Sequence, residues 1–262
     1  MASKNQTTIR RVARYGWVPD LPDRRDFLYA APPRVAVALP PKVDLRSKCP
    51  KVYDQGELGS CTANAIGGAI EFDQMKQGNP KPPFTPSRLF IYYHERVIEG
   101  TVNTDGGAQI RDGIKACAKQ GACPESMWPY DISKFTDQPP DACYTTASEH
   151  LIKIYSRVPR TLGSMKGCLA QGYPFVFGFT VYESFESQEV AQTGVVPMPQ
   201  PKEAALGGHA VLAAGYIESE QMFLVRNSWG PKWGLKGYFK MPYHYLIDPD
   251  LADDFWTIRL TA

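Results

Sequence analysis

The stretch QGELGSCTAN, residues 55–64, contains the start of a predicted helix. Ser60 is a residue type that caps helix N-termini, and apolar residues recur at helical spacing from Cys61 onward. Gly78 is the first strong stop signal after them. The sequence therefore predicts a helix from Cys61 to Gly78, with a cysteine at its first position.

Two further helices are predicted, at Pro86 to Glu99 and at Ala108 to Gln120, where Gly121 ends the pattern. Inside the helix that begins at Cys61, Gly67 and Gly68 each cost about 1 kcal/mol of helix stability relative to alanine. We therefore expect another element to pack very close to this helix.

After about residue 147 the pattern changes to short β-rich runs. These runs are HLIKIYSRV, PFVFGFTVY, HAVLAAGYI, MFLVRNSW, GYFKM and FWTIRL. Helices first and antiparallel strands later predict an α+β fold of two subdomains, with the cleft between them as the natural site.

The composition of the 262 residues is that of an ordinary globular protein, with a formal net charge of +2 and both signs scattered along the chain. Nothing predicts a nucleic-acid or membrane partner, and no run approaches the ~20 apolar residues of a membrane span. The first residues lack the apolar run of a secretory signal, so the protein is expected in the cytoplasm or exported by an unrecognised route. Small polar or peptide substrates fit best.

Cysteine and acidic residues show neither a disulfide scaffold nor metal-ligand spacing. Most of the six cysteines are interpreted as reduced thiols, although the Cys117/Cys123 neighbourhood could hold a bridge. No metal or other cofactor is predicted.

Residues 1–39 form a predicted extension ahead of the folded domain at 40–262. The extension is rich in Pro, Asp and aromatic residues and has no helical or alternating periodicity. Such a segment cannot make its own core, and its aromatic residues favour a strap over another surface. It is either a stabilising strap or a short pro-segment that covers the cleft, and we favour the covering role.

Three polar residues, Cys61, His209 and Asn227, have the chemistry of a nucleophilic site. A helix N-terminus and a protonated imidazole both stabilise a thiolate, and Cys61 is predicted at such an N-terminus. HAVLAAGYI and MFLVRN are predicted to pair about the turn ESEQ, which places His209 near Asn227 within a slip of a few positions. A neutral amide there can orient the imidazole without neutralising its charge.

Gln55 precedes the predicted nucleophile by one short loop. Its side-chain amide, together with the backbone N–H of Cys61, could form an oxyanion hole for a tetrahedral intermediate.

With these residues in that order, the chain resembles the papain family of cysteine peptidases. The match covers roughly residues 40–262 and includes motifs beyond the triad. They are LPPKVDLRSKCPKVYDQG, DGGAQIRDGIKACAKQGACPESMWPYD and RNSWGPKWGLKGYFKM. The resemblance implies a papain-like fold, with a helical left subdomain and an antiparallel β-barrel-like right subdomain around an active-site cleft.

The resemblance also implies roles for single residues. Cys61 would be the nucleophile, His209 the general base and then acid, Asn227 its orienting partner and Gln55 the oxyanion donor. Further substrate-binding residues are implied around them. Trp229 would shield the His–Asn bond and border the leaving-group side, Gly106 and Gly107 would face an extended substrate, and Gly208, Gln109, Gly207 and residues near Leu246 would border the subsites.

Some positions depart from the family pattern. Leu58 and Thr104 stand where the family usually has a pair of bridged cysteines, and Thr62 stands where it has an aromatic residue. Residues 1–39 are expected to be too short for the family's long helical propeptide. The predicted activity is that of a monomeric cysteine endopeptidase on peptides or proteins, made as a zymogen if residues 1–39 cover the cleft. The alternatives are a thiol amidase or transferase with the same triad, or a catalytically idle binding protein.

Overall fold

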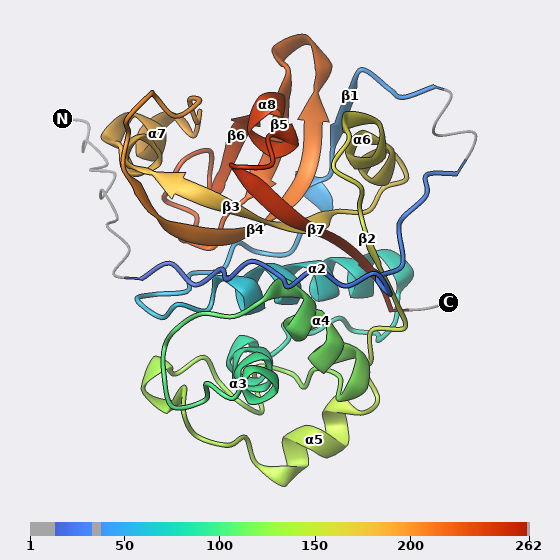
Figure 1. Cartoon of the computed structure of the whole chain (residues 1–262). Coiled ribbons are helices and arrows are strands. Elements are labelled where there is room, and N and C mark those ends of the chain that lie inside the picture. Colours follow the sequence, from blue (N-terminus) through green and yellow to red (C-terminus); the bar gives the residue numbers. More distant parts are fainter. Residues whose placement is uncertain (1–13, 33–37, 261–262) are drawn as a thin grey trace, which may run out of the picture.

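The computed structural model describes residues 14–32 and 38–260, and the remaining parts of the predicted extension, at 1–13 and 33–37, lie outside the described residues. Figure 1 shows two halves, one built from helices and one from a sheet, with the long helix α2 between them. This is the α+β arrangement that the sequence predicts.

The helical half consists of α2 (Cys61–Gln77), α3 (Arg88–Glu99), α4 (Ile110–Lys119) and α5 (Asp141–Ala147). The three predicted helices are confirmed, and their ends differ from the predicted ones by two residues or fewer. The short helix α5 was not predicted.

The predicted role of Ser60 as a side-chain cap is wrong. Helix α2 does begin at Cys61, but the Ser60 side chain caps no backbone N–H. Its hydroxyl instead hydrogen-bonds the hydroxyl of Tyr130 at 2.5 Å. At the other end, Gly78 takes a left-handed conformation with φ of 66° and ends the helix as predicted.

The sheet half is antiparallel throughout, with strand order β2-β7-β3-β4-β5-β6 and β1 paired to β4. Every predicted β-rich run holds all or part of one of these strands, whereas β1 was not predicted. The strands are β1 (Lys42–Asp44), β2 (Ile154–Arg157), β3 (Phe175–Tyr182), β4 (Ala205–Ile217), β5 (Met222–Arg226), β6 (Tyr238–Pro242) and β7 (Ala252–Arg259).

Short helices cover the sheet and its ends. They are α6 (Leu162–Ala170), α7 (Gln188–Thr193) and α8 (Tyr243–Ile247), with single 3-10 turns at Arg46–Lys48, Ile132–Lys134, Glu183–Glu186 and Glu218–Glu220. Rings from several of these elements fill the core. Phe179, for example, packs edge-on against Phe185 and near Phe239.

The close packing expected at the two helix glycines is confirmed most clearly at Gly68. A Cβ added there would lie 3.2 Å from Nε of Arg226 and 3.6 Å from Cδ2 of Leu212. Because these two residues belong to β5 and β4, α2 lies directly against the sheet. The contact holds the first residue of α2 beside the strand that carries His209.

Residues 14–32, here called the strap, cross between the helical and the sheet halves (Figure 1, dark blue). Isolated bridges join the strap to Ala108 through Trp17 and to Arg157 through Leu28. The strap therefore spans the junction at which the sequence predicts the site.

Candidate active site

Cys61 is completely buried at the first position of α2. Its sulfur accepts the backbone N–H of Ala210 on β4 at 3.3 Å. Burial raises the pKa of the Cys61 thiol to about 12, although the backbone amides of Ala210, of Gly16 on the strap and of Thr62 act to lower it. The thiolate expected from the sequence is therefore not stabilised while the strap is in place.

His209 and Asn227 meet as predicted, with His209 Nε2 and Asn227 Oδ1 2.9 Å apart. Asn227 Oδ1 also accepts the backbone N–H of Ser228 at 2.8 Å, so it acts as an acceptor and His209 Nε2 carries the hydrogen. Nδ1 is then the nitrogen that can take up a proton. Trp229 stacks on the His209 ring, with centroids 5.2 Å apart and planes at 30°.

Gln55 is buried near this group, and its side chain is held at both ends. Its Oε1 accepts from the Ser228 hydroxyl at 2.5 Å, and its Nε2 donates to the carbonyl of Leu58 at 3.0 Å. An amide nitrogen carries two hydrogens, so the bond to Leu58 leaves one for another acceptor.

The strap runs directly beside Cys61 at Gly16. A Cβ on Gly16 would lie 1.7 Å from the carbonyl oxygen of Gly59, so only glycine fits this approach. Beside it, the ring of Tyr15 lies edge-on to His209 with centroids 6.0 Å apart, and its hydroxyl donates to Glu186 at 2.5 Å.

The predicted glycine pair, Gly106 and Gly107, lies along the strap, and the two residues differ in the space around them. A Cβ on Gly107 would meet the carbonyl oxygen of Gly16 at 2.2 Å, whereas one on Gly106 would meet only Thr104 Oγ1 within 4 Å, at 3.8 Å. The backbone pairing itself falls on the next residue. Ala108 donates to Gly16 O at 2.8 Å and accepts from Val18 N at 3.1 Å.

Gly208 takes part in a pocket that holds the ring of Trp17. The Gly208 carbonyl accepts the Trp17 backbone N–H at 2.8 Å, and a Cβ on Gly208 or on Gly178 would collide with the Trp17 ring. The indole Nε1 donates to Asp254 Oδ2 at 3.0 Å. Asp254 is 1% exposed, and its backbone is left-handed with φ of 57°.

Farther along the strap, Gln109 and Asp20 anchor the chain. Gln109 Oε1 accepts the backbone N–H of Leu21 at 3.0 Å, so this predicted subsite residue does face the cleft. The Asp20 carboxyl accepts from the backbone N–H of Arg111 at 3.0 Å and from Trp256 Nε1 at 2.8 Å.

Sequence reasoning missed the pocket residues Gly178 and Asp254 and the anchor of Asp20. Their motifs carry no distinctive spacing, because the contacts come from β3, β7 and the irregular strap. The one available signal was Trp17, an aromatic residue in a segment with no core of its own.

The departures from the family pattern have simple packing explanations. Leu58 is buried among apolar side chains, and the Thr104 hydroxyl donates to the carbonyl of Thr101. Thr62, beside the nucleophile, donates a hydrogen bond of 2.7 Å to the buried carboxyl of Glu95 on α3. All six cysteines are free thiols, including Cys117 and Cys123.

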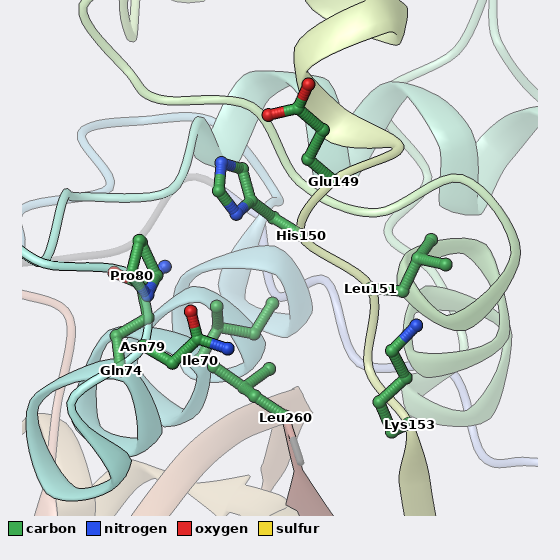
Figure 2. A pocket seen from close by; sticks show the side chains of 9 residues that line it. All are labelled: Ile70, Gln74, Asn79, Pro80, Glu149, His150, Leu151, Lys153 and Leu260. Atoms are coloured by element: carbon green, nitrogen blue, oxygen red, sulfur yellow. The ribbon is translucent and has the colours of Figure 1, made fainter.

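A small pocket lies apart from the strap. It has a volume of about 60 Å³, and Figure 2 shows Ile70 and Gln74 of α2 on one side and His150 on the segment before β2 on the other. None of the predicted site residues lines it. This hollow is therefore separate from the site that the sequence predicts.

Among residues 14–32 and 38–260, no group of three or more His, Cys, Asp or Glu side chains is arranged to hold a metal ion. The helices of the same residues include none long and apolar enough to span a membrane.

Comparison with known proteins places this geometry in a family. Residues 39–246 match the model of the papain family of cysteine proteases. Xylellain, a cysteine protease from Xylella fastidiosa, has a similar structure, with a TM-score of 0.89 and 47% identity over 97% of this chain and 98% of xylellain.

More distant similarities agree. An uncharacterized peptidase C1-like protein of Acanthamoeba polyphaga mimivirus is 44% identical over 97% of this chain and 88% of its own length. Digestive procathepsin L 3 of Tenebrio molitor shares the fold, with a TM-score of 0.70 at 20% identity over 90% of this chain and 74% of its own. The chain therefore belongs to the papain family of cysteine peptidases.

Proposed function

We propose that this cysteine peptidase is a monomeric endopeptidase that uses Cys61, His209, Asn227 and Gln55, and that the strap keeps it latent. The observation that carries the proposal is the position of the strap, which passes Gly59 closely at Gly16 and bonds Gly208 O through Trp17 N, next to the hydrogen-bonded pair of His209 and Asn227. A peptide backbone thus already lies where a substrate would react.

The geometry supports a catalytic role for each of these residues. Once the strap leaves, His209 takes the thiol proton, and the Cys61 sulfur adds to the peptide carbonyl carbon. The resulting oxyanion would be held by the second amide hydrogen of Gln55 and by the backbone N–H of Cys61. His209 then gives the proton to the leaving amine, and water, deprotonated by His209, hydrolyses the thioester and restores the thiol.

The pairing of the strap favours a peptide over a small amide as substrate. Gly208 O and both backbone groups of Ala108 hydrogen-bond the strap main chain, as in strand addition. A cleft that pairs with the backbone on two sides recognises an extended chain rather than a compact amide. This supports peptide hydrolysis over the amidase or transferase alternative.

The strap resists cleavage because it runs in the wrong direction. Tyr15 lies against His209 and Trp229, on the leaving-group side, while Trp17 and Asp20 lie on the acyl side. A substrate has its N-terminal residues on the acyl side, so the strap is reversed. It also presents an amide N–H, and not a carbonyl carbon, to the sulfur.

Substitution of Gly16 by alanine in the full chain tests both parts of the proposal. The added Cβ would collide with the carbonyl of Gly59, and the backbone of Gly16 is not in a left-handed conformation, so alanine disturbs docking and not local folding. We expect peptide–coumarin hydrolysis to rise by about tenfold or more, since loss of about 1.4 kcal/mol of docking shifts the equilibrium tenfold.

Gly163→Ala is the matched control, because a Cβ there meets nothing within 4 Å. Cys61→Ala added to Gly16→Ala should abolish hydrolysis. Cleavage of small amides but not of peptides would instead support the amidase. A catalytically idle binding protein would hydrolyse neither substrate, even with the strap displaced.

A further inference from the structure

A carboxyl-binding site lies in the cleft beyond the Trp17 pocket. Both oxygens of Asp20 accept hydrogen bonds from the domain, Oδ1 from Arg111 N at 3.0 Å and Oδ2 from Trp256 Nε1 at 2.8 Å. The Asp20 side chain is completely buried there. Trp256 and Arg111 are themselves 0% and 5% exposed, so this is a built site and not a surface contact.

Two guanidinium groups flank the same carboxyl. Arg111 Nη2 lies 3.9 Å and Arg157 Nη1 3.8 Å from Asp20 Oδ2. The same arginines lie 3.3 Å and 3.7 Å from Asp26, which is also on the strap. Both acidic partners of Arg111 thus belong to the segment that must leave before a substrate can enter.

The charges that remain in the domain do not replace these partners. Asp254 lies 3.0 Å from Arg157 Nη2, and Asp253 pairs with Arg157 at 2.9 Å and with Arg160 at 2.7 Å. Asp253 and Asp254 then face three arginines, and Arg111 is the one that loses its ion pairs with the strap. Asp112, the next residue, still attracts Arg111, but it does not form a close ion pair with it. A partly buried cation without a close partner favours an incoming anion.

We propose that Arg111, Arg157 and Trp256, here called the arginine subsite, select peptide substrates with an aspartate or glutamate two or three residues before the side chain that enters the Trp17 pocket. The spacing follows from the strap, in which Asp20 is three residues after Trp17 and the chain direction is reversed. The inference rests on the proposed function, because it names the substrate class of that same cleft.

The hydrogen-bond donors of the arginine subsite distinguish an aspartate side chain from an asparagine side chain. The subsite offers an N–H to each of the two Asp20 oxygens. An asparagine in that position would turn its own NH₂ toward one of these donors, and it would carry no charge for the two arginines. A site built this way rejects the analogue that leaves its donors unpaired.

The test uses the full chain with Gly16→Ala, Asp20→Ala and Asp26→Ala, here called the opened variant, which displaces the strap and frees both arginines. Its probes are peptide–coumarins with phenylalanine one residue before the residue at the scissile bond, and with Asp or Asn two or three residues before the phenylalanine. We expect kcat/KM to favour Asp over Asn by about tenfold at one of the two positions, the value of one charge-assisted hydrogen bond.

Arg111→Gln in the opened variant should reduce this ratio to about two or less, since the remaining contacts are neutral or shared. Arg160→Gln is the matched control and should keep the ratio, because Arg160 pairs with Asp253 and lies on the rim. Arg157→Gln is a second test of the subsite if Arg111→Gln lowers the melting temperature. Equal kcat/KM for Asp and Asn at both positions would overturn the proposal, and so would a preference that survives both substitutions.

Binding separates this inference from the proposed function. Fluorescein-labelled versions of the same peptides, without the coumarin, are titrated into the opened variant carrying Cys61→Ser and followed by anisotropy. Tighter binding of the Asp peptides, lost in Arg111→Gln, supports the subsite even if no peptide is hydrolysed, in which case only the catalytic proposal fails. Equal binding of Asp and Asn peptides overturns the subsite even if both are hydrolysed.

Discussion

The backbone amide of Gly16, on the strap, acts on the sulfur of Cys61, the predicted nucleophile, to lower the pKa of its thiol. In the proposed mechanism a substrate would bring an electrophilic carbonyl carbon to the same sulfur, whereas the strap brings an amide N–H. The strap would therefore occupy the reacting position without offering a group that the sulfur can attack.

Strap docking should weaken as pH rises. The docked carboxyl of Asp20 has a pKa of about 7, above the ~3.9 of a free aspartate, so the bound strap takes up a proton. Its contribution to docking is full below about pH 4 and is lost as pH rises through 7. We expect peptide hydrolysis by the wild-type protein, divided by that of Asp20→Asn at the same pH, to increase between pH 5 and pH 8.

Asp20→Asn serves as the reference because it removes this titration but leaves Cys61 and His209 in place. A ratio that stays flat across this range would mean that Asp20 does not couple proton uptake to docking. A ratio that falls as pH rises would mean that docking releases a proton instead of taking one up.

Removal of the orienting amide should slow the reaction. In the Gly16→Ala protein, Asn227→Ala deletes the acceptor 2.9 Å from His209 Nε2, so the ring loses its fixed tautomer and orientation. We expect kcat/KM to fall by about 10- to 100-fold, part of the 10²–10⁴ that a positioned acid–base group supplies. Unchanged kcat/KM with an unchanged melting temperature would remove Asn227 from the mechanism.

The Thr62–Glu95 contact should contribute to stability. Thr62→Val keeps the side-chain shape but removes the donor to the buried Glu95 carboxyl, which costs about 1–2 kcal/mol in unfolding free energy. Thr145→Val is the control, because Thr145 is exposed and bonds within its own short helix. Urea denaturation of the two variants measures the difference, and equal midpoints would show that the buried hydrogen bond adds nothing.

Much of the fold could be predicted because its signals are local. The helix from Cys61 to Gly78 follows from periodicity and a glycine stop, and the β-rich runs follow from their composition. The sequence predicts that His209 approaches Asn227 because the turn between their two strands is recognisable. In the structure Leu212 pairs with Arg226, so His209 and Asn227 are not directly opposite each other, but their side chains still meet.

The rest depends on contacts between distant segments. The cap prediction for Ser60 failed because Tyr130, far along the chain, takes its hydroxyl. The strap sequence has no periodicity from which its pairing with Ala108 and Gly208 could be predicted. That pairing depends on the close passage of Gly16 between Gly59 and Gly107. Asp254 enters the site through a left-handed turn that no spacing rule indicates.

The rate at which iodoacetamide alkylates Cys61 tests the central claim most directly. Peptide mass spectrometry identifies the labelled residue, and the wild-type protein is compared with Gly16→Ala and Gly163→Ala across pH 5 to 10. Because Cys61 is buried under the strap with a pKa of about 12, we predict slow labelling in the wild type and Gly163→Ala. Gly16→Ala should label at least about tenfold faster, with an apparent pKa below that of an ordinary thiol. Equal rates in all three proteins, or an ordinary thiol pKa in Gly16→Ala, would contradict the account of a strapped nucleophile paired with His209.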